Sequence, residues 1–151
     1  MPDASFHDAD DRPLRLMALD EEDLPVLSAL VQDAVLGGGD MRWDARARRL
    51  DILLNRFRWE RGAREAERVR SVLTIGCALG VASDGVARAG DAVLSLLDVV
   101  FEQGAEPPGG ALVLRFAGDG AIRVQVEAIE VRLTDVTRPY AAPSGKVPHH
   151  D

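Results

Sequence analysis

The stretch "RLDILLNRFRWE", residues 49–60, decides the fold class, because its residues alternate at the period of a β-strand. Phe57 and Trp59 share one face with Leu53, so apolar side chains occur on both faces of part of this strand. The pattern predicts a strand that is central in a sheet or partly covered by a helix. The opposite face ends in two arginines, which are expected to emerge near the end of the sheet. The residues on this opposite face are Leu50, Ile52, Leu54, Arg56 and Arg58.

Further alternating segments are separated by short turns, of which "GDG" at 118–120 is the strongest signal. Strands joined by short turns pair antiparallel, because parallel pairs need long crossovers. The sequence therefore predicts a curved antiparallel sheet or a partly open barrel of about six or seven strands. Besides 49–60, the predicted strands cover 14–19, 40–44, 69–81, 92–103, 111–118 and 120–127.

Two helices are expected to pack on this sheet, which makes the fold class α+β. In the N-terminal one, over about 21–35, apolar residues recur at helical spacing behind acids that suit the positive end of a helix dipole. A short closing helix is expected over about 127–136, where apolar residues continue at helical spacing. Ile129, Val131 and Leu133 also alternate, so a bulged strand remains the alternative there.

The chain has the size of one domain, with 151 residues of which 46% are apolar and 28% charged, as is typical of a soluble globular protein. The predicted domain covers 14–136. A flexible N-terminus over 1–13 and a flexible tail over 137–151 flank it, because neither carries an apolar stripe. The acidic N-terminus lacks the basic and apolar segments of a secretory signal, so we expect a cytoplasmic protein.

Four segments in the order "LSALVQDAV", "LNRFRWE", "LSLLDVVFE" and "FAGDGAIRVQVEAIEVRLTDV" carry a family resemblance. The chain resembles, from about Leu14 to Val136, a small alphaproteobacterial family catalogued as domain of unknown function 2948. The resemblance implies no functional residues and no particular fold. Two departures are visible: Ala128 stands where a cysteine is expected in many members, and Asp119 interrupts what is usually a run of glycines. A catalytic role of a cysteine at the first position could not be shared by this chain.

A strand-rich body closed by a C-terminal helix is also similar to pleckstrin-homology-like barrels. This likeness concerns architecture alone and implies no function. We keep it as the alternative fold.

Histidine and cysteine chemistry is disfavoured by the positions of these residues. His7, His149 and His150 lie in the predicted flexible ends, whereas catalysis needs a rigidly held imidazole. Cys77 is the single cysteine and stands among apolar neighbours, as a small buried residue does. No spacing of histidine or cysteine suggests zinc, and no glycine-rich loop suggests a phosphate site. We expect no catalytic residue, metal or cofactor.

The candidate ligand or partner surface is built from arginines and carboxylates. Residues 41–70 hold ten arginines against five acids, a net charge of +5 in a chain of net charge −7. An arginine-rich hairpin in this range can pair with the protein's own acids or can meet an anionic partner. Two neighbouring carboxylates near 127–130 can share acid and base roles, although a solvated edge is the favoured interpretation. The candidates are Asn55, Arg56, Arg58, Glu60, Arg46, Arg48, Arg49, Glu127 and Glu130.

These patterns favour a non-enzymatic module that binds a protein or another macromolecule. One alternative is a small enzyme that uses carboxylates and arginine, and another is a module that binds an anionic ligand through the arginine-rich hairpin. The expected partner is a protein, with a homodimer through a sheet edge or the hairpin among the options. The net charge of −7 argues against nucleic acid, and no apolar run approaches the roughly 20 residues of a membrane helix.

Overall fold

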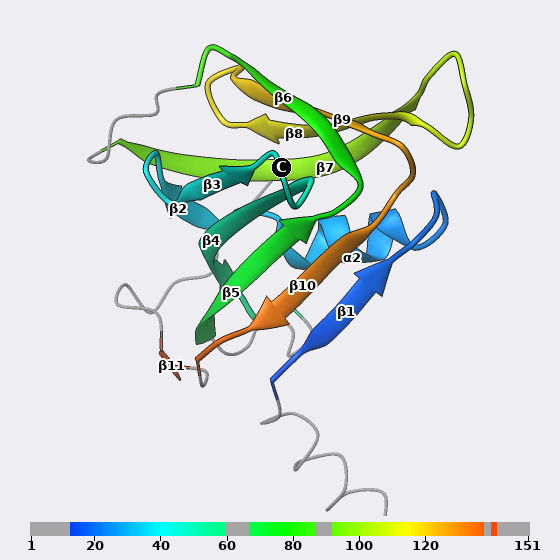
Figure 1. The fold of residues 1–151 in the computed structure, drawn as a ribbon. Helices are drawn as coiled ribbons and strands as arrows, with labels where there is room; N and C mark the ends of the chain where they lie inside the picture. Colours follow the sequence, from blue (N-terminus) through cyan, green and yellow to red (C-terminus); the bar gives the residue numbers. More distant parts are fainter. Residues whose placement is uncertain (1–12, 60–66, 87–91, 138–139, 142–151) are drawn as a thin grey trace, which may run out of the picture.

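The computed structural model describes residues 13–59, 67–86, 92–137 and 140–141, and it contains eleven strands and one helix in that part of the chain (Figure 1). The helix is α2 (Leu24–Leu30). The strands are β1 (Arg15–Ala18), β2 (Val35–Gly37), β3 (Met41–Asp44), β4 (Arg49–Phe57), β5 (Glu67–Ile75), β6 (Ala78–Asp84), β7 (Val93–Gln103), β8 (Gly110–Phe116), β9 (Ala121–Val126), β10 (Val131–Asp135) and β11 (Tyr140–Ala141).

All strand pairs are antiparallel, as predicted, and they follow the order β1-β10-β5-β4-β2-β7-β8-β9-β6. β3 pairs with β4 beside this path, and β11 pairs with β5. The predicted number of six or seven strands is wrong. One reason is that the segment 69–81 forms two strands separated by a bend at Gly76 and Cys77. Another is that β2 and β11, with three residues and two, are too short to show a period.

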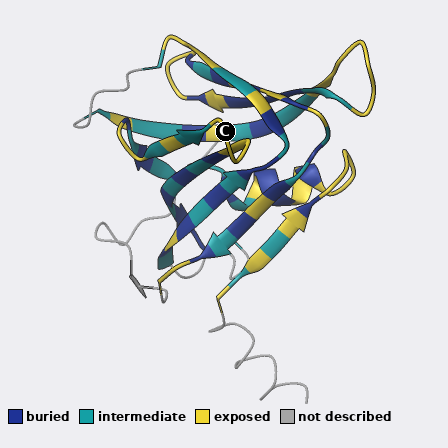
Figure 2. Ribbon diagram, in the orientation of Figure 1, coloured by how far each residue is buried: buried dark blue, intermediate teal, exposed yellow. Residues whose placement is uncertain are grey.

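The sheet folds into two layers that enclose one core (Figure 1). β7, β8, β9 and β6 form one layer, and β1, β10, β5 and β4 form the other. The chain passes between the layers at two neighbouring corners, from β5 to β6 and from β9 to β10. Buried positions recur along β5 and β10 in Figure 2, and one apolar cluster joins residues of both layers, such as Leu73 and Leu114. The layers are therefore held by a common core.

The helix is shorter than predicted, with seven residues in place of the range 21–35. Before it, the Asp20 carboxylate accepts the N–H groups of Glu22 and Asp23 at 3.0 and 2.8 Å, which holds these acids in a turn. Pro25 stands in the first helical turn, as expected. After the helix, Asp33 adopts a left-handed backbone with φ 64°, and the chain enters β2. The end of the predicted helical range forms β2 instead, because pairing with β4 and β7 outweighs the helical spacing of the apolar residues there.

The predicted closing helix over 127–136 is wrong, because this segment contains β10. Val131, Leu133 and Asp135 are buried in alternation, and β10 pairs with β5 on one side and β1 on the other. The alternating pattern, which was the alternative, therefore prevails over the helical one. A pleckstrin-homology-like barrel would need a C-terminal helix here, and the described chain instead continues to the strand β11.

The predicted turns are confirmed between β3 and β4 and between β8 and β9. In the second turn, Gly118 and Asp119 have φ of 88° and 69°. No helix in the described ranges is long and apolar enough to cross a membrane.

Candidate functional site

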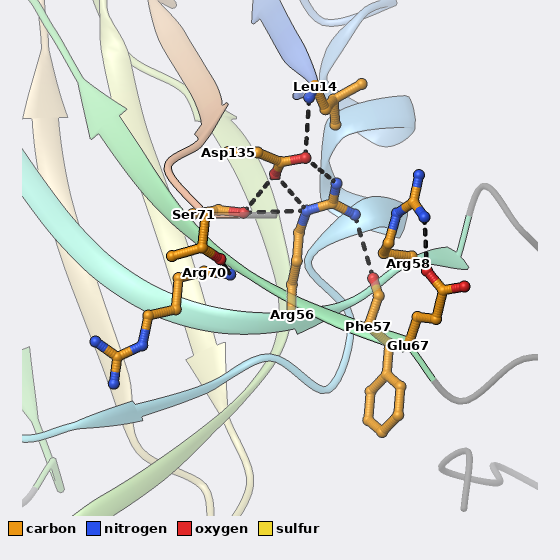
Figure 3. Close-up of polar contacts among 9 residues, drawn as sticks. Leu14, Arg56, Phe57, Arg58, Glu67, Arg70, Ser71 and Asp135 are labelled. Carbon is orange, nitrogen blue, oxygen red and sulfur yellow. Dashed lines mark hydrogen bonds and ion pairs between the residues drawn. The ribbon is translucent and has the colours of Figure 1, made fainter. Parts of the chain in front are cut away.

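A buried polar cluster centres on Arg56, which has no exposed surface (Figure 3). Its Nε and Nη2 donate to the two carboxylate oxygens of Asp135 at 3.1 and 3.0 Å, a bidentate pair. Ser71 stands beside this pair: its hydroxyl donates to Asp135 Oδ1 at 2.6 Å and accepts from Arg56 Nε at 3.2 Å. Asp135 also accepts the backbone N–H of Leu14 at 2.9 Å.

This cluster ties neighbouring strands together rather than offering a docking surface. Arg56, Ser71 and Asp135 come from β4, β5 and β10, which are adjacent in the sheet, and Leu14 directly precedes β1. Because all three side chains are buried, an outside ligand would have to separate these strands to reach the guanidinium. Alternation correctly predicted that Arg56 shares a face with Ile52 and Leu54. The expectation that its side chain emerges near the end of the sheet is wrong, because Arg56 is buried.

Arg58 and the aromatic residues on either side of it also make contacts inside the protein. Arg58 is buried and donates from Nη1 to Glu67 Oε2 at 2.7 Å. The indole N–H of Trp59 donates to the backbone carbonyl of Gln32 at 2.8 Å. The ring of Phe57 lies 5.7 Å from that of Trp59, between centroids. The polar and aromatic end of β4 thus joins the sheet to the segment that follows α2.

Two of the predicted carboxylates lie at the corner between the layers, and one of them, Glu127, meets an arginine there. Arg48 forms an exposed ion pair with Glu127, although the two lie far apart in the sequence. The carbonyl of Cys77 accepts the N–H of Glu127 at 2.9 Å, and the N–H of Gly76 donates to the carbonyl of Glu130 at 2.8 Å. The corner therefore brings together the turn after β3, the bend between β5 and β6, and the end of β9.

The Cys77 thiol at this corner is not activated. Partial burial raises its pKa, the negative charges of Glu130 and Glu127 raise it further, and Arg48 opposes them. A raised pKa lowers the fraction of thiolate, which is the nucleophilic form. Cys77 also has a left-handed backbone with φ 52°, so its place is set by the bend of the chain. These properties suit a structural residue better than a nucleophile.

The remaining predicted candidates do not form one surface. Arg46 lies in the exposed turn between β3 and β4, and Arg49 pairs with Asp51 at 3.0 Å. The Oδ1 atom of Asn55 is buried and makes no hydrogen bond with any described residue, at the wall of a hollow of about 160 Å³. Glu60 lies outside the described residues.

A surface trough, which sequence reasoning missed, runs along the seam between α2 and β7. Its larger hollow has about 450 Å³ and is lined by Pro25 and Ala29 of the helix and by Leu97 and Val100 of the strand. A second hollow of about 280 Å³ continues it past the end of β7 toward Pro108. Glu21 and Phe101 line both, so the two hollows lie next to each other. We call this pair of hollows the α2–β7 trough.

Part of the β7 backbone faces the trough without a strand beside it. β2 pairs only with Val93–Ser95 of β7, and Ser28 of the helix accepts the N–H of Val99 through its hydroxyl at 2.9 Å. Backbone groups two and four residues further on point in the same direction. The N–H and C=O of Phe101 and the N–H of Gln103 therefore point to this side, where no described residue binds them. Within the described ranges, this part of β7 is therefore a free strand edge.

The rim of the trough is acidic. Asp20, Glu21 and Asp98 line it, and no arginine, lysine or histidine does so among the described residues. Asp98 is neutralised by an ion pair with Arg115 on the neighbouring strand β8. Asp20 and Glu21 make no ion pair with a described residue, so the net charge facing the trough is negative at the junction of the hollows.

The features that the sequence analysis missed differ in how clearly the sequence indicates them. Asp135 continues the alternation of Val131 and Leu133, and an acid at an inward position requires a cationic partner. Arg56 also continues an apolar face, so their pairing could have been proposed. The trough carries no such signal, because it exists only where α2 meets β7.

Comparison with known proteins yields one family. A family model described as "Protein of unknown function (DUF2948)" matches residues 14–150. No curated protein and no solved structure matches the chain.

Proposed function

The chain belongs to the DUF2948 family, whose description states no activity, and we propose that it is a non-enzymatic protein-binding module. In this proposal a partner contributes an extended peptide to the α2–β7 trough. The free backbone of Phe101 and Gln103 at the wall of the trough is the observation that carries it.

Strand addition fits this geometry because it needs unpaired backbone next to pockets for side chains. The peptide backbone would pair with Phe101 and Gln103. Its side chains would lie against Leu97 and Pro25, which line the larger hollow. A trough that follows β7 from Leu97 to Gln103 is about 20 Å long at the rise of a β-strand, enough for a peptide of about six residues.

The acidic rim supports a basic peptide. Glu21 lines both hollows, Asp20 lines the smaller one, and the whole chain has a net charge of −7. Lysine or arginine between apolar residues of the peptide would meet these carboxylates, whereas an acidic peptide would be repelled.

Two other functions have weaker support. An enzyme built on carboxylates and arginine would need accessible groups, but the Arg56 and Asp135 pair is buried. A module for anionic ligands would need a cluster of free guanidinium groups on the arginine-rich hairpin, where Arg48 and Arg49 are paired with acids and only the exposed Arg42 and Arg46 are without an ion pair to a described residue. Nucleic acid is not proposed as a partner, for the same reason and because of the net negative charge.

The proposal is tested by titrating the 15N-labelled protein with a capped hexapeptide of alternating valine and lysine. We expect saturable shifts of the backbone amides of Phe101 and Gln103, with the matching glutamate peptide binding several-fold more weakly. Replacing the central residues of the peptide by proline removes its N–H donors and should abolish binding.

Glu21→Lys is expected to weaken the lysine peptide about fivefold, because it reverses one charge at the rim. Glu22→Lys is the matched control: its charge change is the same, but Glu22 does not line the trough. Equal affinity for the lysine and glutamate peptides, or shifts confined to other strands, would contradict the proposal.

A further inference from the structure

A second free strand edge lies at the opposite end of the same layer, along β6. β6 pairs with β9 on one side, and among the described residues no strand pairs with it on the other, where the N–H of Ala78 at the start of β6 donates to the carbonyl of Arg48 at 2.9 Å. In the β8–β9 hairpin, Phe116 N–H donates to Gly120 O, which sets the direction of each backbone group along β9. By the same alternation, Ala82 faces β9, while Val81 and Ser83 direct their N–H and C=O groups away from the sheet.

This edge lacks the side chains that usually block edge-to-edge pairing. Residues 78–83, "ALGVAS", contain no charge and no proline, and Leu79 is 57% exposed. A β-bulge lies between Ala78 and Gly80, but the pairing with β9 is regular from Gly80 to Asp84. β1, at the other end of the sheet, has only four residues and begins with exposed Arg15.

We propose that β6 pairs antiparallel with β6 of a second copy of this chain, about a two-fold axis at Val81. The outward groups of Val81 suit that axis, because Val81 N–H can donate to Val81 C=O of the second copy while the reverse bond also forms. Ser83 then lies opposite Leu79 of the second copy, and the paired stretch ends there, because the N–H of Ala78 donates to the carbonyl of Arg48 in its own chain. The pairing is self-complementary, as a two-fold interface requires.

The charges of the strand permit this pairing. Asp84 is the single charged residue of β6, and it lies at the end of the strand. In the proposed register the two Asp84 residues are about 20 Å apart at the rise of a β-strand. That distance is more than twice the screening length at physiological ionic strength, which is about 8 Å, so their repulsion is small. The inference does not rest on the proposed peptide site, because the trough lies at the other edge of this layer.

Sedimentation equilibrium from about 1 to 200 µM tests the inference. We expect the wild-type chain to approach twice the mass of one chain as its concentration rises. The double variant Leu79→Lys/Ser83→Lys places two lysines opposite each other at both ends of the pairing, and it should weaken the dimer at least about tenfold.

The charge-paired variant Leu79→Glu/Ser83→Lys provides the test of register. The same two positions then carry opposite charges across the interface, so the dimer should return to near the wild-type strength. Val136→Lys is the control, because Val136 is 51% exposed and lies outside β6. Circular dichroism confirms that each variant is folded. A wild-type monomer at 200 µM, or equal dimerisation of the lysine and charge-paired variants, would overturn the inference.

Discussion

Arg56 shows how far a single residue can be understood from its neighbours in sequence. Alternation with Ile52 and Leu54 correctly assigns its face. Its burial depends on Asp135, which is 79 positions away and can be paired with it only once the strand order is known. The same limit applies to Arg48 and Glu127, which were both candidates but became one ion pair only in the structure.

Arg56→Met is predicted to lower the free energy of unfolding by about 3–5 kcal/mol, because it leaves the buried carboxylate of Asp135 without its cation. Urea denaturation measures this loss. Arg123→Met is the control, since Arg123 pairs with Glu102 on the surface and should cost less than about 1 kcal/mol. The double variant Arg56→Met/Asp135→Leu should lose clearly less than the sum of its single changes, and strict additivity would contradict a coupled pair.

Cys77 is predicted to react slowly with iodoacetamide at pH 8. Its raised pKa reduces the thiolate fraction at any pH below that pKa, so the rate-against-pH curve should lie at higher pH than that of a free cysteine peptide. Glu130→Gln removes one negative charge that raises the pKa and should move the curve to lower pH. Asp84→Asn removes a negative charge that does not contribute to this shift and should leave the curve in place. A faster reaction than that of the peptide would refute the inactive thiol.

At the scale of elements, the apolar residues of 127–136 fit both the period of a helix and the period of a strand. Ile129 and Leu133 fit a helix, and Ile129, Val131 and Leu133 fit a strand. The open edges of β5 and β1 on either side decide between them, since β10 completes hydrogen bonding with both. The local sequence does not indicate which strands lie beside this segment, and for this reason a helix was predicted. The β8–β9 turn was predictable because its glycines act locally.

Asp119→Ala is predicted to destabilise the fold by about 1 kcal/mol, since alanine tolerates the left-handed backbone of this turn less well than aspartate. Asp119→Gly should be neutral or stabilising, because glycine adopts that conformation without strain. Thermal denaturation distinguishes the two variants. Equal melting temperatures for them would show that the left-handed conformation carries no cost at this position.

For the whole molecule, the antiparallel sheet followed from alternating strands and short turns, whereas the order of its strands did not. Strand order depends on where the chain bends between layers, and Gly76 and Cys77 resemble ordinary strand residues in the sequence "TIGCAL". The α2–β7 trough follows from this order, because α2 contacts β7 at Val99, beyond the residues that pair with β2, and on that side no described strand lies beside Phe101 and Gln103. The candidate site is thus a property of the assembled fold.

The order β7-β8-β9-β6 has a consequence for how tightly a partner would be held. Pairing two copies through β6 would produce a continuous layer of eight strands with one trough at each outer edge, about 34 Å apart at the usual spacing of strands. A ligand that carries two basic, extended segments on a flexible linker could occupy both troughs at once. The second segment would then bind at the high effective concentration set by the linker, so weak individual contacts would add up to strong, bivalent attachment. A partner with a single segment would gain none of this avidity and would dissociate readily.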